Sequence, residues 1–189
     1  MDLHSESIQG FFDMPADNVY ATKIMHDDIK SRTSKDEKIL VVSPDVGGVV
    51  RARALAKFLD ESDLAIIDKR RASSNESDVM NIIGDVKGKT CLIVDDIIDS
   101  GGTIVNAVEA LKKAGAVDVY VFITHAVLSG AAVDKIKKSK IKKLIITDTI
   151  DNSKKIKNNN KIEVLSISSL MAEAIKRIAN SNSVSDLFN

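Results

Sequence analysis

A continuous apolar run that ends in paired carboxylates and a glycine turn constrains this chain more than any other feature. Residues 91–98 read Cys-Leu-Ile-Val-Asp-Asp-Ile-Ile, and Asp-Ser-Gly-Gly-Thr follows at 99–103. An uninterrupted apolar run indicates a strand that is buried on both faces, as in a parallel sheet. A helical pattern begins directly after the turn. Ligands of open α/β sheets bind beyond the carboxyl ends of such strands, so we expect a ligand site at this turn.

The residue types at the turn suit a sugar phosphate. Glycines such as Gly101 and Gly102 let backbone N–H groups close around phosphate oxygens, and the N-terminus of the following helix adds a favourable dipole. The carboxylates of Asp95 and Asp96 accept hydrogen bonds from sugar hydroxyls or hold a cation. The alternative is an ordinary strand-to-helix turn that Thr103 caps. Two acids on a buried strand, with a third acid opening the glycine turn, favour the ligand site.

Strand and helix patterns alternate along the chain. The expected strands are 39–43, 64–68, 90–94, 117–124, 144–147 and 164–166. The expected helices are 20–31, 48–59, 103–114, 131–138 and 168–179. This alternation predicts a three-layer α/β fold, in which a mostly parallel sheet of about five strands is flanked by helices on both faces. No linker rich in proline or glycine divides the chain, so we expect one domain over residues 1–189.

Two further strand ends carry charged residues. Pro-Asp-Val-Gly-Gly follows the first strand, and we expect its Asp45 to lie beside Asp95 at one sheet edge. For Arg51 and Arg53, in the next helical pattern, anion binding and an ordinary helix face are equally consistent with the sequence. Lys-Arg-Arg at 69–71 follows the second strand and opens a polar stretch that we expect to be mobile. Three cations there suit a clamp on phosphates, and the alternative is a solvated basic turn.

Composition limits the classes of partner. The net charge of the 189 residues is +0, with 44% hydrophobic and 29% charged residues, which is ordinary for a globular domain and does not favour nucleic acid. No apolar run reaches the length of a membrane span, and residues 1–10 lack the pattern of a signal peptide, so we expect the cytoplasm. The one cysteine, Cys91, is expected to be a small core residue. Ten lysines between Lys135 and Lys161 form either an anion-binding patch or, as we expect, solvated helix and loop positions.

The turn at 95–103 resembles the loop that binds phosphoribosyl pyrophosphate (PRPP) in proteins with the type I phosphoribosyltransferase fold. Further segments resemble the ribose-phosphate pyrophosphokinase (PRPP synthetase) family, in order along the chain. They are 1–4 (Met-Asp-Leu-His), 8–13, 42–45, 68–71, 80–85, 124–130 and 172–175. The resemblance implies that a pyrophosphoryl group moves from ATP to the 1-hydroxyl of ribose 5-phosphate, which yields PRPP and AMP and uses Mg²⁺. It also implies a homo-oligomer.

Individual roles follow from the resemblance. Lys69 matches the family's catalytic lysine, and Arg71 matches its arginine partner, which also contacts ribose 5-phosphate. His4 and Asp45 match positions associated with Mg²⁺. The ribose 5-phosphate contacts correspond here to Asp95, Asp96, Asp99, Ser100, Gly101, Gly102 and Thr103.

The resemblance covers the C-terminal half of the family's two-part chain. The N-terminal half, which supplies much of the ATP site, has no counterpart among these residues. We therefore expect a truncated chain, the product of an internal start, or one half of a split enzyme, with little activity by itself. Two alternatives are a phosphoribosyltransferase that consumes PRPP, which Lys69 and its basic neighbours disfavour, and a non-catalytic regulatory subunit, which the intact loop disfavours. His125 is either structural or close to the site.

Overall fold

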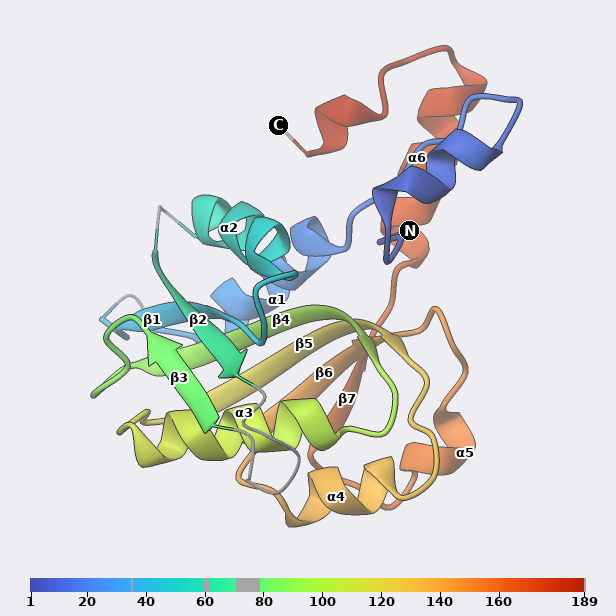
Figure 1. The fold of residues 1–189 in the computed structure, drawn as a ribbon. Helices are drawn as coiled ribbons and strands as arrows, with labels where there is room; N and C mark the ends of the chain where they lie inside the picture. Colours follow the sequence, from blue (N-terminus) through green and yellow to red (C-terminus); the bar gives the residue numbers. More distant parts are fainter. Residues whose placement is uncertain (35, 60–61, 71–78, 189) are drawn as a thin grey trace.

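The computed structural model describes residues 1–34, 36–59, 62–70 and 79–188, which form a seven-stranded sheet with helices on both faces (Figure 1). The spatial order is β3-β2-β1-β4-β5-β6-β7. All neighbouring strands are parallel except β3, which runs antiparallel to β2. The strands are β1 (Ile39–Ser43), β2 (Asp63–Arg70), β3 (Val79–Ile83), β4 (Thr90–Ile98), β5 (Val119–Ala126), β6 (Lys143–Thr147) and β7 (Ile162–Leu165).

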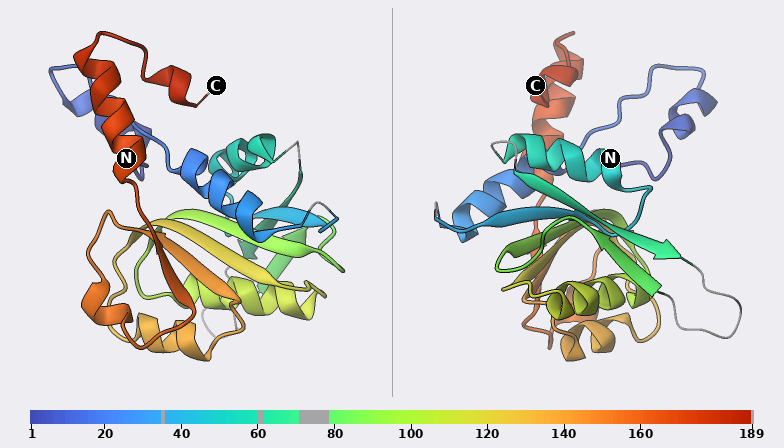
Figure 2. Two further views of the ribbon diagram at one scale, coloured as in Figure 1. Left: turned by 180° about the vertical axis from the view of Figure 1, so that it is seen from behind. Right: turned by 60° about the vertical axis from the view of Figure 1, so that its left-hand side comes forward.

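Helices cover the two faces of the sheet, as Figures 1 and 2 show. One face carries α1 (Thr22–Arg32) and α2 (Val49–Phe58), and the other carries α3 (Gly102–Lys113), α4 (Ala132–Lys138) and the single turn α5 (Ser153–Ile156). The remaining elements are α6 (Ser168–Ala179) and the short 3₁₀ helices η1 (Glu6–Phe11) and η2 (Ser185–Leu187). The three-layer α/β fold predicted from the sequence is confirmed.

The core explains why the central strands are apolar throughout. Successive side chains of a strand point to opposite faces, so Val42 packs toward the α3 face and Val41 toward the α2 face. Ile93 and Leu92 of β4 divide in the same way. Cys91 is fully buried in this core, as expected, and burial raises the pKa of its thiol to about 11. A strand between two helical layers therefore needs apolar residues at every position.

The two ends of the chain pack against each other apart from the central sheet. Val19, from the N-terminal segment, forms a third apolar cluster with Leu170 and Ala174 of α6 and with Val184 and Leu187. The N-terminal segment and α6 project from the same side of the sheet (Figures 1 and 2).

Several sequence predictions need correction. The sheet has seven strands within the described residues, more than the estimate of about five. The six strand segments expected from the sequence are present, and the seventh, β3, was overlooked: its middle residue is Asn81, and it pairs only with β2 at the sheet edge. The one-turn helix α5 was also overlooked. The strand predicted at 90–94 continues to Ile98, so the paired acids belong to the strand itself. The stretch 71–78, expected to be mobile, lies outside the described residues. No helix in the part of the chain described here is long and apolar enough to span a membrane.

Candidate functional site

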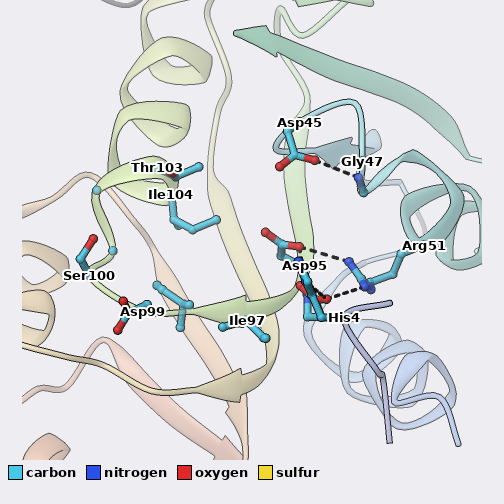
Figure 3. Close-up of a pocket in the computed structure, with 15 residues that line it drawn as sticks. His4, Asp45, Gly47, Arg51, Asp95, Ile97, Asp99, Ser100, Thr103 and Ile104 are labelled. Carbon is cyan, nitrogen blue, oxygen red and sulfur yellow. Dashed lines mark hydrogen bonds and ion pairs between the residues drawn. The ribbon is translucent and has the colours of Figure 1, made fainter. Parts of the chain in front are cut away.

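A cavity of about 610 Å³ opens at the carboxyl ends of β1 and β4 (Figure 3). From β1 the chain continues to β2 on one side, whereas β4 pairs on the other side and leads to β5. This reversal of strand order is the topological switch point at which open α/β sheets bind their ligands. The cavity is lined by His4, Asp45, Gly47, Gly48, Arg51, Asp95, Asp96, Ile97, Ile98, Asp99, Ser100, Gly101, Gly102, Thr103 and Ile104.

The glycine turn forms one wall of the cavity. Gly101 has a φ of 73°, in the left-handed region that glycine tolerates best, and it immediately precedes α3. The amide of Val105 donates to the Gly101 carbonyl at 3.0 Å, so the amides of Gly102 to Ile104 precede the first bonded turn of the helix. Amides at a helix N-terminus bind anions. The turn predicted from the sequence therefore has the backbone geometry of a phosphate cradle.

The opposite wall holds a cluster of two acids and two basic side chains (Figure 3). Arg51 of α2 reaches both acids, with Nη1 at 3.1 Å from Asp95 Oδ1 and Nη2 at 3.0 Å from Asp96 Oδ2. His4 donates from Nδ1 to the same oxygen of Asp96 at 2.9 Å. The Asp96 side chain is only 6% exposed, whereas that of His4 is 77% exposed. The sequence could not decide the role of Arg51, and the structure places it at the centre of this cluster.

The two acids differ in their proton affinity. Burial, followed by the negative charge of Asp96, raises the pKa of Asp95 to about 7. Burial also opposes ionisation of Asp96, but the hydrogen bond from His4 and the charge of Arg51 outweigh it and lower the pKa of Asp96. Near neutral pH Asp96 is therefore ionised, whereas Asp95 is partly protonated.

The raised pKa of Asp95 predicts a pH dependence of stability. Between the pKa of an unfolded aspartate, about 3.9, and the folded value of about 7, the folded state binds more protons, so stability falls as pH rises. Asp95→Asn should not show this loss. The unfolding free energy of the variant minus that of the native chain should therefore rise by more than about 1 kcal/mol from pH 4.5 to pH 7.5. Urea denaturation at the two pH values measures it. An equal difference at both values would contradict the assignment.

Arg51 is expected to stabilise the fold by neutralising this cluster. Arg51→Met should lower the unfolding free energy at pH 7.5 by about 1–3 kcal/mol, because it leaves the buried Asp96 carboxylate without its guanidinium partner. Arg53→Met is the matched control, since Arg53 lies on the exposed face of the same helix. Equal denaturation midpoints for the two variants would show that the ion pairs contribute nothing.

Asp45 lies in the turn after β1, at the edge of the cavity. Its Oδ1 accepts a hydrogen bond from the Gly48 amide at 2.8 Å, and Ser43 Oγ donates to its carbonyl at 2.6 Å. In the view of Figure 3, Asp45 and Asp95 lie on one side of the cavity and Thr103 and Ser100 on the other. His4 and Asp45 both line the cavity, but no group of three metal-ligating side chains forms among the described residues.

One of the residues predicted to clamp phosphates, Lys69, lies at the same sheet edge. Ser43, the last residue of β1, is level with Ile66 in β2, so β2 continues past the end of β1. Lys69 lies in this extension, opposite Met80 of β3. The prediction that Asp45, Lys69 and Asp95 share one edge is confirmed for their positions in the sheet. Arg71 lies outside the described residues.

A residue overlooked in the sequence supports the glycine turn from behind. Lys135 of α4 donates from Nζ to the Ser100 carbonyl at 3.2 Å. Lys135 is exposed, as the sequence predicted for the lysines of this segment, but the lysine-rich pattern could not single out the one that contacts the turn. Backbone bonds from Val127 to Ile98 at 2.9 Å and from Ser129 to Asp99 at 3.2 Å complete this support. The loop between β5 and α4 therefore braces the turn.

Comparison with known proteins identifies the relationship. The family model of the phosphoribosyl synthetase-associated domain matches residues 61–189. Ribose-phosphate pyrophosphokinases of Hyphomonas neptunium and Vibrio cholerae are 58% and 53% identical, each over 100% of this chain and 60% of the relative. The solved phosphoribosylpyrophosphate synthetase of Mycobacterium smegmatis superposes with a TM-score of 0.85 at 39% identity, covering 96% of this chain and 58% of that one. The chain thus spans about 60% of the length of the curated relatives it matches. Because the family model covers well over half of these residues, the chain belongs to the phosphoribosyl synthetase family.

Proposed function

We propose that this chain is part of a ribose-phosphate pyrophosphokinase, which transfers a pyrophosphoryl group from ATP to the 1-hydroxyl of ribose 5-phosphate. One observation carries the proposal: a glycine turn at a helix N-terminus and a pair of carboxylates face one cavity from the two ends of a single segment, 95–103. A ribose phosphate carries both matching groups, a phosphate and a row of hydroxyls, on one small molecule. The ribose-phosphate pyrophosphokinases among the relatives support the same reaction.

The cavity offers a distinct contact to each part of ribose 5-phosphate. The amides from Gly101 to Thr103, with the Thr103 hydroxyl, bind the 5-phosphate at the positive end of α3. The carboxylates of Asp95 and Asp96 accept hydrogen bonds from the ribose hydroxyls, and bonds to charged acceptors are about twice as strong as neutral ones. In the free protein, the ion pairs of Arg51 with both acids offset the repulsion between the two carboxylates.

The donor set of the cavity fits Mg²⁺. His4 and Asp45 each line the cavity, and Mg²⁺ typically uses one or two carboxylates together with substrate phosphates and water instead of a full cage of protein ligands. The lack of a three-ligand group among the described residues agrees with that mode of binding. Bound Mg²⁺ would neutralise charge on the transferring phosphates. Asp45 would hold it beside the turn that Gly48 fixes.

The reaction joins two substrates at this sheet edge. The 1-hydroxyl oxygen of ribose 5-phosphate bonds to the β-phosphorus of ATP, the bond from that phosphorus to the oxygen bridging the α-phosphate breaks, and AMP leaves with that oxygen while the hydroxyl proton is released. Lys69, with Arg71, would stabilise the charge that develops on the transferring group. We place Lys69 in this role because β2 carries it past the end of β1 and because the family resemblance assigns it.

We also propose that the complete enzyme is a homo-oligomer. Phe11, Phe12 and Met14 expose 85%, 52% and 69% of their surface on the projecting N-terminal segment. Large apolar side chains gathered on one exposed segment are typical of subunit interfaces.

Product analysis tests the proposed reaction. The complete enzyme, given ribose 5-phosphate, ATP and Mg²⁺, should release AMP and PRPP in equal amounts, and ribose in place of ribose 5-phosphate should give neither. Formation of ADP in place of AMP would show transfer of a single phosphoryl group and would refute the proposal. Consumption of added PRPP with a nucleobase would instead favour a phosphoribosyltransferase. The 189-residue chain alone is expected to show little turnover, because catalysis depends on positioning both substrates together.

A further inference from the structure

A buried acid anchors the segment that carries His4. Asp2 is only 5% exposed, and its carboxylate accepts hydrogen bonds from the Ala21 amide at 3.1 Å and from the Thr124 hydroxyl of β5 at 2.5 Å. Its own amide donates to the Val19 carbonyl at 2.9 Å. The φ of Asp2 is 37°, a left-handed conformation that is uncommon outside glycine and persists only where surrounding contacts impose it.

His125 holds the same segment from the end of β5. Its Nε2 lies 3.0 Å from the Met1 carbonyl and 3.3 Å from the Asp2 carbonyl, so this nitrogen carries a proton and donates to them. Its Nδ1 lies 3.0 Å from the hydroxyl of Thr149, whose single proton can be donated either to this nitrogen or to the Thr124 carbonyl 2.9 Å away. The imidazole is thus fixed on both nitrogens between the N-terminal segment and the sheet.

The anchor lies directly beside the acid cluster. In the sheet register, Ile123 pairs with Asp95 and His125 pairs with Ile97, so β5 carries the anchor next to the strand that carries the acids. His4 follows Asp2 by two residues and meets Asp96 at 2.9 Å. Because the His4 side chain is 77% exposed, its own packing cannot fix its position. The anchored backbone at Asp2 therefore contributes to holding His4 beside Asp96.

We infer that Asp2 and His125 are positioning residues, which hold His4 against Asp96 at the rim of the cavity without contacting the ligand themselves. The network accounts for two polar residues that the site does not use: Asp2 turns inward to Thr124, and His125 turns to backbone carbonyls. The function served by His4 rests on the proposed reaction, but its placement does not. This separation allows the inference to be tested apart from catalysis.

Imidazole ¹⁵N NMR of the chain reads the placement of His4 directly. The sequence contains three histidines, so their signals are readily assigned with single His→Gln variants. In the native chain, at a pH where the imidazoles are neutral, His4 should give the signature of the Nδ1–H tautomer that donates to Asp96. Asp2→Ala should replace it with the averaged signal of a free imidazole. Asp2→Asn, which keeps an oxygen for both donors, should largely restore it, and Asp13→Ala in the exposed part of the same segment should leave it unchanged.

An unchanged His4 signal in Asp2→Ala would overturn the inference. If Asp2→Ala fails to fold, Thr124→Val, which removes one of the two donors, decides the question in the same way. A second titration uses Mn²⁺ as a probe with ribose 5-phosphate present, and Asp2→Ala should weaken Mn²⁺ binding at least about fivefold while Asp13→Ala does not. Failure of the native chain to bind Mn²⁺ or ribose 5-phosphate would count against the proposed function, yet the His4 signal would still decide the positioning role.

Discussion

Lys69→Ala in the complete enzyme is expected to lower kcat on the order of 10²–10³-fold, the usual cost of removing one group that stabilises transition-state charge. The KM for ribose 5-phosphate should change little, because Lys69 lies in the extension of β2 and not in the 95–103 segment that we propose binds this substrate. An interaction made mainly in the transition state lowers kcat and kcat/KM together. Steady-state rates of AMP release with both substrates varied provide the measurement.

The control for Lys69→Ala is Lys87→Ala, which removes an exposed lysine before β4, at the amino end of that strand. It should leave both kcat and KM near the native values. A Lys69 variant with native kcat, or one in which only the KM rises, would place the clamp on the phosphates elsewhere.

Gly101→Ala is expected to weaken ribose 5-phosphate binding at least about tenfold, or about 1.4 kcal/mol. A side chain in the left-handed region costs roughly 1–2 kcal/mol, and relieving that strain requires the peptides of the turn to rotate from the arrangement seen here. The added Cβ itself fits, since its nearest neighbour is Ala132 Cβ at 3.8 Å. The loss would therefore come from the backbone conformation and not from a clash.

Gly88→Ala is a matched control for this change. Gly88 has the same φ of 73° in a turn that does not line the cavity, and an added Cβ meets nothing within 4 Å. Both variants should lose similar unfolding free energy, but only Gly101→Ala should lose affinity in calorimetry. Equal affinities for the two variants would show that the amides of the glycine turn do not hold the phosphate.

The segment 91–103 could be predicted from the sequence because its signals are local. An apolar run, paired acids and a glycine turn are adjacent in the chain, and the strand, the turn and the start of α3 are all present in the structure. Asp45 and Lys69 could be placed at the same edge because parallel strands of alternating α/β chains end together. Neither inference needed any contact between distant residues.

The remaining features depend on contacts that no local pattern encodes. Arg51 meets Asp95 across 44 positions, and Lys135 meets Ser100 across 35, so their roles follow only from how α2 and α4 pack on the sheet. The segment at 1–4 was noticed for its resemblance, but that resemblance gave a role to His4 alone. The resemblance did not show that the Asp2 carboxylate accepts a hydrogen bond from the Thr124 hydroxyl, 122 positions away. The strand β3 was overlooked because the polar Asn81 interrupts its apolar residues and because its only pairing, with β2, is not visible in a local pattern.

Calorimetric titration of the 189-residue chain with ribose 5-phosphate tests whether residues 95–103 recognise both ends of a phosphorylated ribose. We expect one binding site per chain, at least about tenfold weaker binding of ribose (about 1.4 kcal/mol), and competition by inorganic phosphate. Affinity for ribose equal to that for ribose 5-phosphate, or no binding of either sugar, would contradict it.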